Sequence, residues 1–336
     1  MNATEETMPV PVLSIETYYR LVVGFVLVCL PIVSVVSVLN NALSQLTFIS
    51  QGLKEHVTFT LFCLSLADFL VALASLGFVF SAPLLLVPLG TGSLMTNLAF
   101  TWMRVMFSDI VVGIIVFISV ERSCCVAFPF RFKLMFNIKK SIIFLAAIVF
   151  FVIGNYIPVY TTFCLDTVLD SSTNTTVFYG CSPPYSAIIF KHIGITFGTI
   201  LSLACEVSTS ISAVVMHVCL RRSSQLRFLM KTAQDIQGSS NKSSTTLSRK
   251  EERAVKMVLV VATVYLLTSV PKVVFNLSLA VSEEMTYGKY SLIGNIIGFT
   301  SYITGTINGT FHLFVFYRYS SLFRKTFRRK FFHLSE

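Results

Sequence analysis

The stretch ISVERSCCVAFPFRFK, from Ile118 to Lys133, sets an acid and a base, Glu121 and Arg122, side by side at the end of a long apolar run. Pro129 and a basic cluster follow within a few residues. Charge at the edge of a membrane span is expensive, so such a pair indicates a function. The alternative interpretation is a solvated pair at the end of a helix.

The composition around this stretch is that of a membrane protein. The chain has 336 residues, of which 54% are hydrophobic and only 12% are charged. A soluble domain carries about 25% charged residues, so the soluble-enzyme classes are excluded. The sequence also shows no metalloprotease, nucleophile-elbow or phosphate-loop motif and no zinc-like cysteine spacing. We therefore expect neither an enzyme nor a cofactor.

Seven apolar stretches are long enough to cross a bilayer, which takes about 20 helical residues. Lipid requires internally satisfied backbone groups, and the stretches are too long for barrel strands. We expect an all-α membrane protein, a seven-transmembrane helix bundle spanning residues 20–316. The expected spans are 20–46, 57–81, 96–127, 139–160, 186–220, 254–280 and 289–316.

The basic residues are sorted by side. Twenty of the 26 lysines and arginines fall in one set of loops and the tail, which the positive-inside rule assigns to the cytoplasm. Residues 1–19 would then form an extracellular N-terminus of a plasma-membrane protein. Glycosylation sequons at Asn2 and Asn174 fall on the predicted outer side. Because the charge is sorted in this way, the net charge of +10 does not indicate nucleic-acid binding.

The last segment, residues 317–336, predicts a short amphipathic eighth helix followed by a cytoplasmic tail. Phe323, Phe327 and Phe331 recur every four residues between basic residues, as in a helix lying on the inner leaflet. Such a helix either anchors the chain to the membrane or docks a partner. The loop at about 221–252 is the longest linker, and its Gly/Ser-rich centre is typical of a flexible segment.

These features resemble the rhodopsin-like (class A) G-protein-coupled receptors. Glu121 and Arg122 lie at the inner end of the third span, as in that family. Asp68 in LSLADFL, Asn41 in LNNAL and Pro271 in the sixth span match its intramembrane acid, asparagine and kink proline. Finer stretches, such as LRRSSQLR and HLFVFYRYSSLFRKTF, resemble the expanded peptide-receptor-like and chemosensory receptors of gastropod molluscs.

The resemblance implies a receptor that binds an extracellular ligand and activates a heterotrimeric G protein. The ligand would be a peptide or a small chemical, and an anionic chemical is one of the alternatives. Glu121 would hold Arg122 at rest, and activation would free Arg122 for the G protein. The sixth span would swing outward at its inner end, near Lys256, about the kink at Pro271. These residues form the expected coupling site.

Several switch positions depart from the family's pattern. Ser123 replaces the usual tyrosine after the arginine, and Ser269 replaces the tryptophan of the sixth span. His312 and Phe316 stand at the asparagine and tyrosine of the seventh-span motif. These departures put the usual activation machinery in doubt and leave the expected fold unchanged.

An intramembrane polar cluster of Asn41, Asp68, Asn308 and His312 follows from the same resemblance. In the family this cluster often holds a sodium ion at the acid. Here a protonated His312 could take the ion's place. Three interpretations stay open: sodium bound at Asp68, a His–Asp pair, and a neutral structural aspartate.

The expected ligand site lies in the outer halves of the spans. Arg104 and Lys272 match cavity positions of the family, and two bases there favour an anionic ligand. Glu206 and Trp102 complete the expected site, although Trp102 is also typical of simple packing. The alternative is internal neutralisation, with Asp109 and Glu206 cancelling the two bases.

One disulfide is implied in the second outer loop. Asn97 stands where the family's third span carries its cysteine. Cys164 and Cys181, both in an oxidising compartment, are then expected to pair with each other. Two free thiols are the alternative.

Two other classes of protein stay open. A seven-span chemosensory ligand-gated channel would have the opposite orientation in the membrane. A small transporter would show internal repeats, and we find none.

Overall fold

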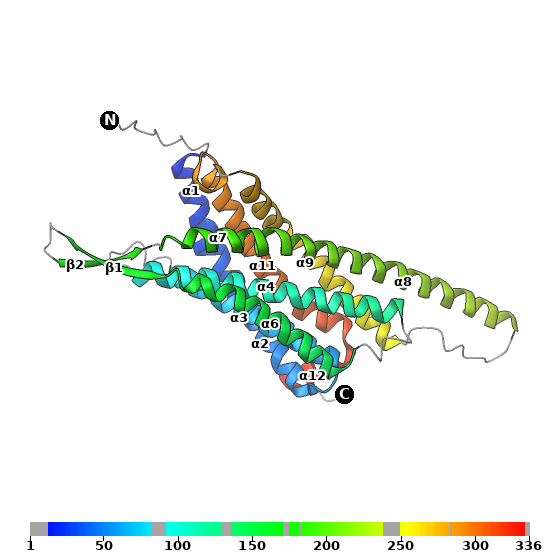
Figure 1. Ribbon diagram of the computed structural model, residues 1–336. Helices are drawn as coiled ribbons and strands as arrows, with labels where there is room; N and C mark the ends of the chain where they lie inside the picture. Colours follow the sequence, from blue (N-terminus) through cyan, green and yellow to red (C-terminus); the bar gives the residue numbers. More distant parts are fainter. Residues whose placement is uncertain are drawn as a thin grey trace.

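The computed structural model describes residues 13–81, 92–128, 136–170, 175–181, 183–237, 249–282 and 284–332. Seven long helical segments of this described part pack side by side in one bundle (Figure 1). The first is made of α1 (Ile15–Val22), the π-helical η1 (Val23–Cys29) and α2 (Leu30–Gln51). The second to fourth are α3 (His56–Ser81), α4 (Gly92–Ala127) and α6 (Ile138–Tyr160). The fifth is α7 (Ser186–Ile193), the π-helical η3 (Gly194–Leu201) and α8 (Ser202–Gln237), followed by α9 (Arg249–Val281) and α11 (Ser291–Tyr319).

The expected spans and the observed helices agree within a few residues at most ends. Six of the described helical segments are long and apolar enough to cross a membrane. The seventh, α11, is as long but carries many Gly, Ser, Thr and Asn residues, which lowers its mean hydropathy. The prediction of an all-α membrane bundle is confirmed. The largest difference is at α8, which continues as helix to Gln237, well beyond the expected end of the fifth span at 220.

Helix α4 lies at the centre of the bundle and contacts α3, α6, α8 and α9. Its core stripe of Ile110, Ile114 and Ile118 recurs every four residues, so these side chains share one buried face. Lipid tails are as apolar as these side chains, so helix association here depends on close packing and polar contacts. The charged residues of α4 therefore sit on a helix that its neighbours hold on several sides.

A β-hairpin projects from one end of the bundle (Figure 1). Strands β1 (Cys164–Asp170) and β2 (Thr175–Cys181) pair antiparallel, with Cys164 opposite Cys181. Their Cα atoms are 5.2 Å apart and the predicted disulfide joins them. We call this end of the bundle the hairpin end. The opposite end, where Glu121 and Arg122 lie, is the basic end.

The predicted eighth helix forms as α12 (Ser321–Phe332) at the basic end, directly after α11. Phe323 is fully buried and packs against Phe48 of α2 and Phe316 of α11, with ring centroids 5.0 and 5.8 Å apart. Lys330 donates hydrogen bonds to the Leu46 carbonyl at 3.0 Å and to Ser50 Oγ at 2.7 Å. The helix is thus fixed to the foot of α2. A short helix, α10 (Glu284–Tyr287), precedes α11 at the hairpin end.

Three predictions lie outside the described residues. They concern glycosylation at Asn2, glycosylation at Asn174, and the flexible centre of the long loop, residues 238–248.

Candidate functional site

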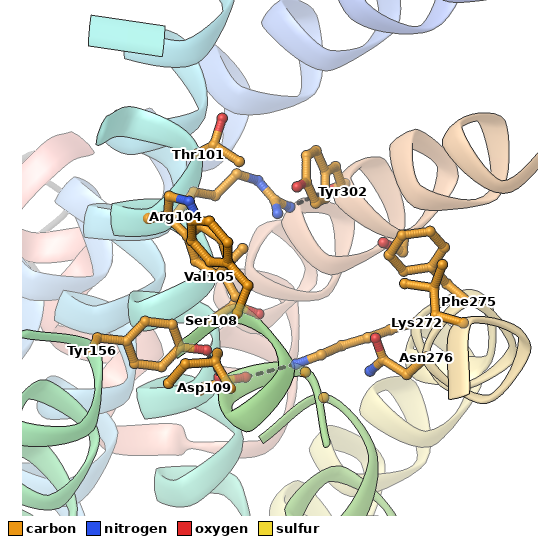
Figure 2. A pocket seen from close by; sticks show the side chains of 17 residues that line it. Thr101, Arg104, Val105, Ser108, Asp109, Tyr156, Lys272, Phe275, Asn276 and Tyr302 are labelled. Atoms are coloured by element: carbon orange, nitrogen blue, oxygen red, sulfur yellow. Dashed lines mark hydrogen bonds and ion pairs between the residues drawn. The ribbon is translucent and has the colours of Figure 1, made fainter. Parts of the chain in front are cut away.

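A cavity of about 380 Å³ lies in the half of the bundle nearer the hairpin end, among α4, α6, α7, η3, α9 and α11 (Figure 2). This volume is in the range of small-molecule sites. Its polar lining comprises Thr101, Arg104, Ser108, Asp109, Tyr156, Lys272, Asn276, Ser301 and Tyr302. Its larger apolar lining residues are Trp102, Val105, Phe190, Ile193, Phe275 and Leu279. We call it the outer cavity.

An ion pair crosses the outer cavity from α9 to α4. Lys272 Nζ lies 2.8 Å from Asp109 Oδ1, and Tyr156 of α6 donates its hydroxyl to Asp109 Oδ2 at 2.5 Å (Figure 2). Both carboxylate oxygens of Asp109 are therefore engaged. Lys272, one of the two predicted ligand-binding bases, is therefore paired with an acid of the protein itself. This agrees with the alternative interpretation, internal neutralisation by Asp109.

Arg104 has different surroundings. Its Nε donates to Ser75 Oγ at 3.0 Å, and its Nη2 donates to the Tyr302 carbonyl at 2.7 Å. The guanidinium also lies 3.9 Å from the centroid of the Tyr302 ring, a cation–π contact. Arg104 is only 3% exposed. Among the described residues Arg104 forms no ion pair, and Asp109 is paired with Lys272 instead.

The other two residues of the predicted ligand site, Trp102 and Glu206, differ in their position relative to the outer cavity. Trp102 lines the outer cavity and stacks on Phe190 of α7, with ring centroids 5.4 Å apart and planes at 6°. Glu206 is not among the lining residues, and its Oε1 atom is buried without a hydrogen-bond partner. Glu206 therefore stands behind the cavity wall rather than in it.

The π-helical segment η3 forms part of the cavity wall. Thr199 Oγ1 donates to the Gly194 carbonyl five residues earlier, at 3.2 Å. A Cβ at Gly198 would lie 3.5 Å from Asn276 Oδ1, so the glycine brings the η3 backbone close to α9. The Nδ2 atom of Asn276 is buried and has no hydrogen-bond partner. An amide donor at the cavity is thus left unmatched.

The structure brings the intramembrane polar cluster together between the two ends of the bundle. His312 Nδ1 lies 2.7 Å from Asp68 Oδ2, and both residues are buried. Gly309 permits this approach, because a Cβ there would lie 2.8 Å from Asp68 Cγ. Asn41 donates to the Gly309 carbonyl at 3.4 Å. A small cavity of about 40 Å³ adjoins Asp68 and Asn308 and also touches Lys272, which links the cluster to the outer cavity.

In this arrangement one oxygen of Asp68 is already bonded to His312. Other oxygen-bearing side chains, among them Ser108, Ser301 and Asn308, line the small cavity, so the bond to His312 is the feature that weighs against sodium. Hard cations need several oxygen ligands, and a protonated imidazole would repel the ion. The geometry therefore favours the His–Asp pair among the three interpretations.

At the basic end, Glu121 is fully buried and has two basic neighbours. Its Oε1 forms an ion pair with Arg122 and lies 2.9 Å from His56 Nε2, at the start of α3. Arg122 Nη2 is also 2.9 Å from the same histidine nitrogen. The predicted pair is thus a cluster of three residues, and it joins α4 to α3.

The structure also places three other residues of the expected coupling machinery, Ser123, Lys256 and Pro271. Ser123 donates to the Ser119 carbonyl at 2.8 Å and to the Ser212 carbonyl of α8 at 3.0 Å, so it ties α4 to the fifth segment. Lys256 pairs with Glu252 one turn earlier on α9, at 2.7 Å. Pro271 lies inside α9, directly before Lys272 of the outer ion pair.

The fold is a seven-helix membrane bundle with a ligand-sized cavity near one end and the buried cluster of Glu121, Arg122 and His56 at the other. These features define the class of seven-transmembrane receptors. The family model described as serpentine type 7TM GPCR chemoreceptor Srw matches residues 87–333. The chain belongs to this family of chemoreceptors, which is a family of receptors and not of enzymes. No curated protein matches the chain. The predicted resemblance to chemosensory seven-transmembrane receptors is confirmed. The resemblance to gastropod receptors stays a prediction.

Sequence reasoning missed several participants, among them His56, Tyr156 and Asn276. His56 and Tyr156 contribute through contacts with a helix far away in sequence, and Asn276 lies beside η3. A polar residue within an apolar span was the available signal for Tyr156 and Asn276. His56 lies just before its span, where a polar residue is ordinary, so the sequence offered no signal for it.

Proposed function

We propose that this protein is a plasma-membrane receptor that binds a small chemical at its outer cavity and activates a heterotrimeric G protein at its basic end. The observation that carries the proposal is the placement of both sites on α4. Arg104 and Arg122 are 18 positions apart in one helix, which at about 1.5 Å per residue is about 27 Å. That separation spans most of a bilayer's apolar core.

A small chemical suits the outer cavity better than a peptide does. The cavity holds about 380 Å³, and its walls are largely aromatic and aliphatic. Such sites typically enclose most of a small ligand's surface and orient it with a few polar groups. A peptide would have to leave most of its length outside. An acidic group on the ligand remains our expectation, and its place in the cavity is argued in the next subsection.

The proposed activation uses α9 as the moving element. Lys272 holds α9 to α4 through Asp109, next to the kink at Pro271. A ligand in the outer cavity would favour an arrangement in which the inner end of α9, from Arg249 to Lys256, swings outward. It can do so only through a difference in affinity between the two arrangements. Arg122, released from Glu121, would then meet the G protein.

Expression with a promiscuous G protein, followed by a screen of small acids, amines and neutral compounds, tests this function. We expect at least one compound to raise signalling in the wild type. Loss of that response in Arg122→Ala, at equal surface level, would support coupling at the basic end. A response carried by ion current in the absence of G protein would contradict the proposal and favour a channel.

Orientation and glycosylation are tested separately. An epitope tag at the N-terminus should be accessible on intact cells, and Asn2→Gln and Asn174→Gln should each lower the apparent mass before deglycosylation. A tag that is detected only after permeabilisation would reverse the proposed orientation.

A further inference from the structure

The charges lining the outer cavity do not balance. The described lining contains two basic side chains, Arg104 and Lys272, and one acidic side chain, Asp109. Asp109 and Lys272 pair with each other at 2.8 Å, which leaves Arg104. The described lining therefore has one basic side chain more than it has acids.

The only acid of the described lining is not available to a ligand. Asp109 Oδ1 binds Lys272 and Oδ2 accepts the hydroxyl of Tyr156. An amine ligand would have to displace one of these donors. Recognition of a ligand cation is thus disfavoured at this acid.

Hydrogen bonds hold the Arg104 side chain in place, but no acid of the described residues forms an ion pair with it. Its contacts to Ser75, the Tyr302 carbonyl and the Tyr302 ring are all to neutral groups. A buried charge without a counter-charge is destabilising, and an anion placed beside it recovers that free energy. A ligand carboxylate within hydrogen-bonding distance of the guanidinium would be such an anion. The unmatched amide Nδ2 of Asn276 offers a second donor in the same lining.

The rest of the lining defines the body of the ligand. Trp102 and Phe190 form a stacked aromatic wall, and Phe275 and Leu279 of α9 add apolar surface. We propose, on the basis of the receptor function proposed above, that the ligand is a monocarboxylic acid with one aromatic or aliphatic body. Arg104 binds its carboxylate, and Lys272 does not take part in the recognition.

The first test requires no ligand. Ser75→Asp places a carboxylate where Ser75 Oγ now accepts from Arg104 Nε, and Ser75→Asn is the matched uncharged control. We expect the purified Ser75→Asp receptor to unfold at a higher temperature than Ser75→Asn, because the new acid compensates Arg104. Equal or lower stability of Ser75→Asp would overturn the claim that Arg104 lacks a counter-charge.

The second test compares head groups on a constant body. Thermal midpoints of the purified wild-type receptor are measured with 3-phenylpropionate, 3-phenylpropanamide and 3-phenylpropylamine, and with octanoate, octanamide and octylamine. We expect stabilisation by an acid and little by its amide or amine. Equal or greater stabilisation by the amides or amines, or none by either acid, would overturn the proposal.

The variants connect the two tests. Arg104→Gln and Ser75→Asp should each weaken binding of the acid by at least about 30-fold, the usual consequence of losing or pre-occupying one partner of a buried charge pair. Ser75→Asp retains the Arg104 side chain, so the test remains available if Arg104→Gln fails to fold. Unchanged acid affinity in Ser75→Asp would contradict the proposal. Because binding is measured without G protein, a failure of coupling alone would leave the ligand class intact and contradict only the receptor mechanism.

Discussion

The two ends of α4 use the same types of side chain in opposite ways. At the hairpin end, Asp109 is shared between Lys272 and Tyr156, and among the described residues Arg104 forms no ion pair beside a ligand-sized cavity. At the basic end, Glu121 is shared between Arg122 and His56. The outer charges join α4 to α9, and the inner charges join α4 to α3. In the described part of the chain, the outer arginine therefore has no acidic partner, whereas the inner arginine has one.

The largest expected effect is the loss of the inner acid. Glu121→Gln removes a buried acid that Arg122 and His56 share, and breaking a fully buried ion pair costs on the order of 3–5 kcal/mol. We expect raised basal G-protein signalling and a lower thermal midpoint of the purified receptor. Basal signalling is compared at matched surface expression, and the thermal midpoint is measured on the purified receptor.

Glu16→Gln is the matched control, since Glu16 forms an exposed pair with Arg20 at the other end of the bundle. Exposed pairs contribute little, so neither signalling nor stability should change. If Glu121→Gln behaved like Glu16→Gln, the inner cluster would be no latch, and the contrast between the two ends would fail.

The second prediction concerns the outer ion pair, which is partly exposed. A double-mutant cycle of Asp109→Asn and Lys272→Met should give a coupling free energy of about 1–3 kcal/mol in thermal or chemical unfolding, as expected for residues in direct contact. Additive effects would mean that the pair does not hold α9 to α4. Asp109→Asn should also make Lys272 available to acidic ligands, which would blur the distinction between Arg104 and Lys272.

A smaller effect is expected at Ser123, which stands where related receptors have a tyrosine. Ser123→Ala removes its hydrogen bond to the Ser212 carbonyl, and a neutral hydrogen bond contributes about 1 kcal/mol. Stability measured by thermal unfolding should fall by that amount. Ser44→Ala is the matched control, because the buried Ser44 hydroxyl donates within α2, to the Asn40 carbonyl at 2.9 Å. A loss at Ser123 no larger than at Ser44 would argue against a tie between α4 and α8.

The smallest effect is expected from sodium. Because His312 already bonds to Asp68, replacing sodium by choline should change the affinity of an activating ligand by less than about fivefold, the lower range of typical coupling. His312→Asn should increase the sensitivity. A strong sodium effect in the wild type would show that the middle of the bundle links its two ends by an ion rather than by a histidine.

The sequence predicted the helices well because span length and charge bias depend on local composition. The pairing of Cys164 with Cys181 and the proximity of Asp68 and His312 followed from the receptor resemblance. The strands of the hairpin, the π-helical turns and the roles of His56 and Tyr156 did not follow. The contacts of His56 and Tyr156 depend on the rotation of one helix against another, which packing decides across the whole bundle. The hairpin strands and the π-helical turns have no motif in the sequence that predicts them.

The π-helical segment η3 has a consequence for how this receptor could change its ligand. A π-helical turn accommodates an additional residue within a helix. Deleting one residue between Gly194 and Leu201 could restore α-helical geometry and would rotate the preceding α7 by about 100° relative to α8, the angle per residue of an α-helix. Phe190 and Ile193 would then leave the cavity wall, and other side chains of α7 would replace them. A single codon lost or gained could thus exchange one side of the ligand site without any substitution in it.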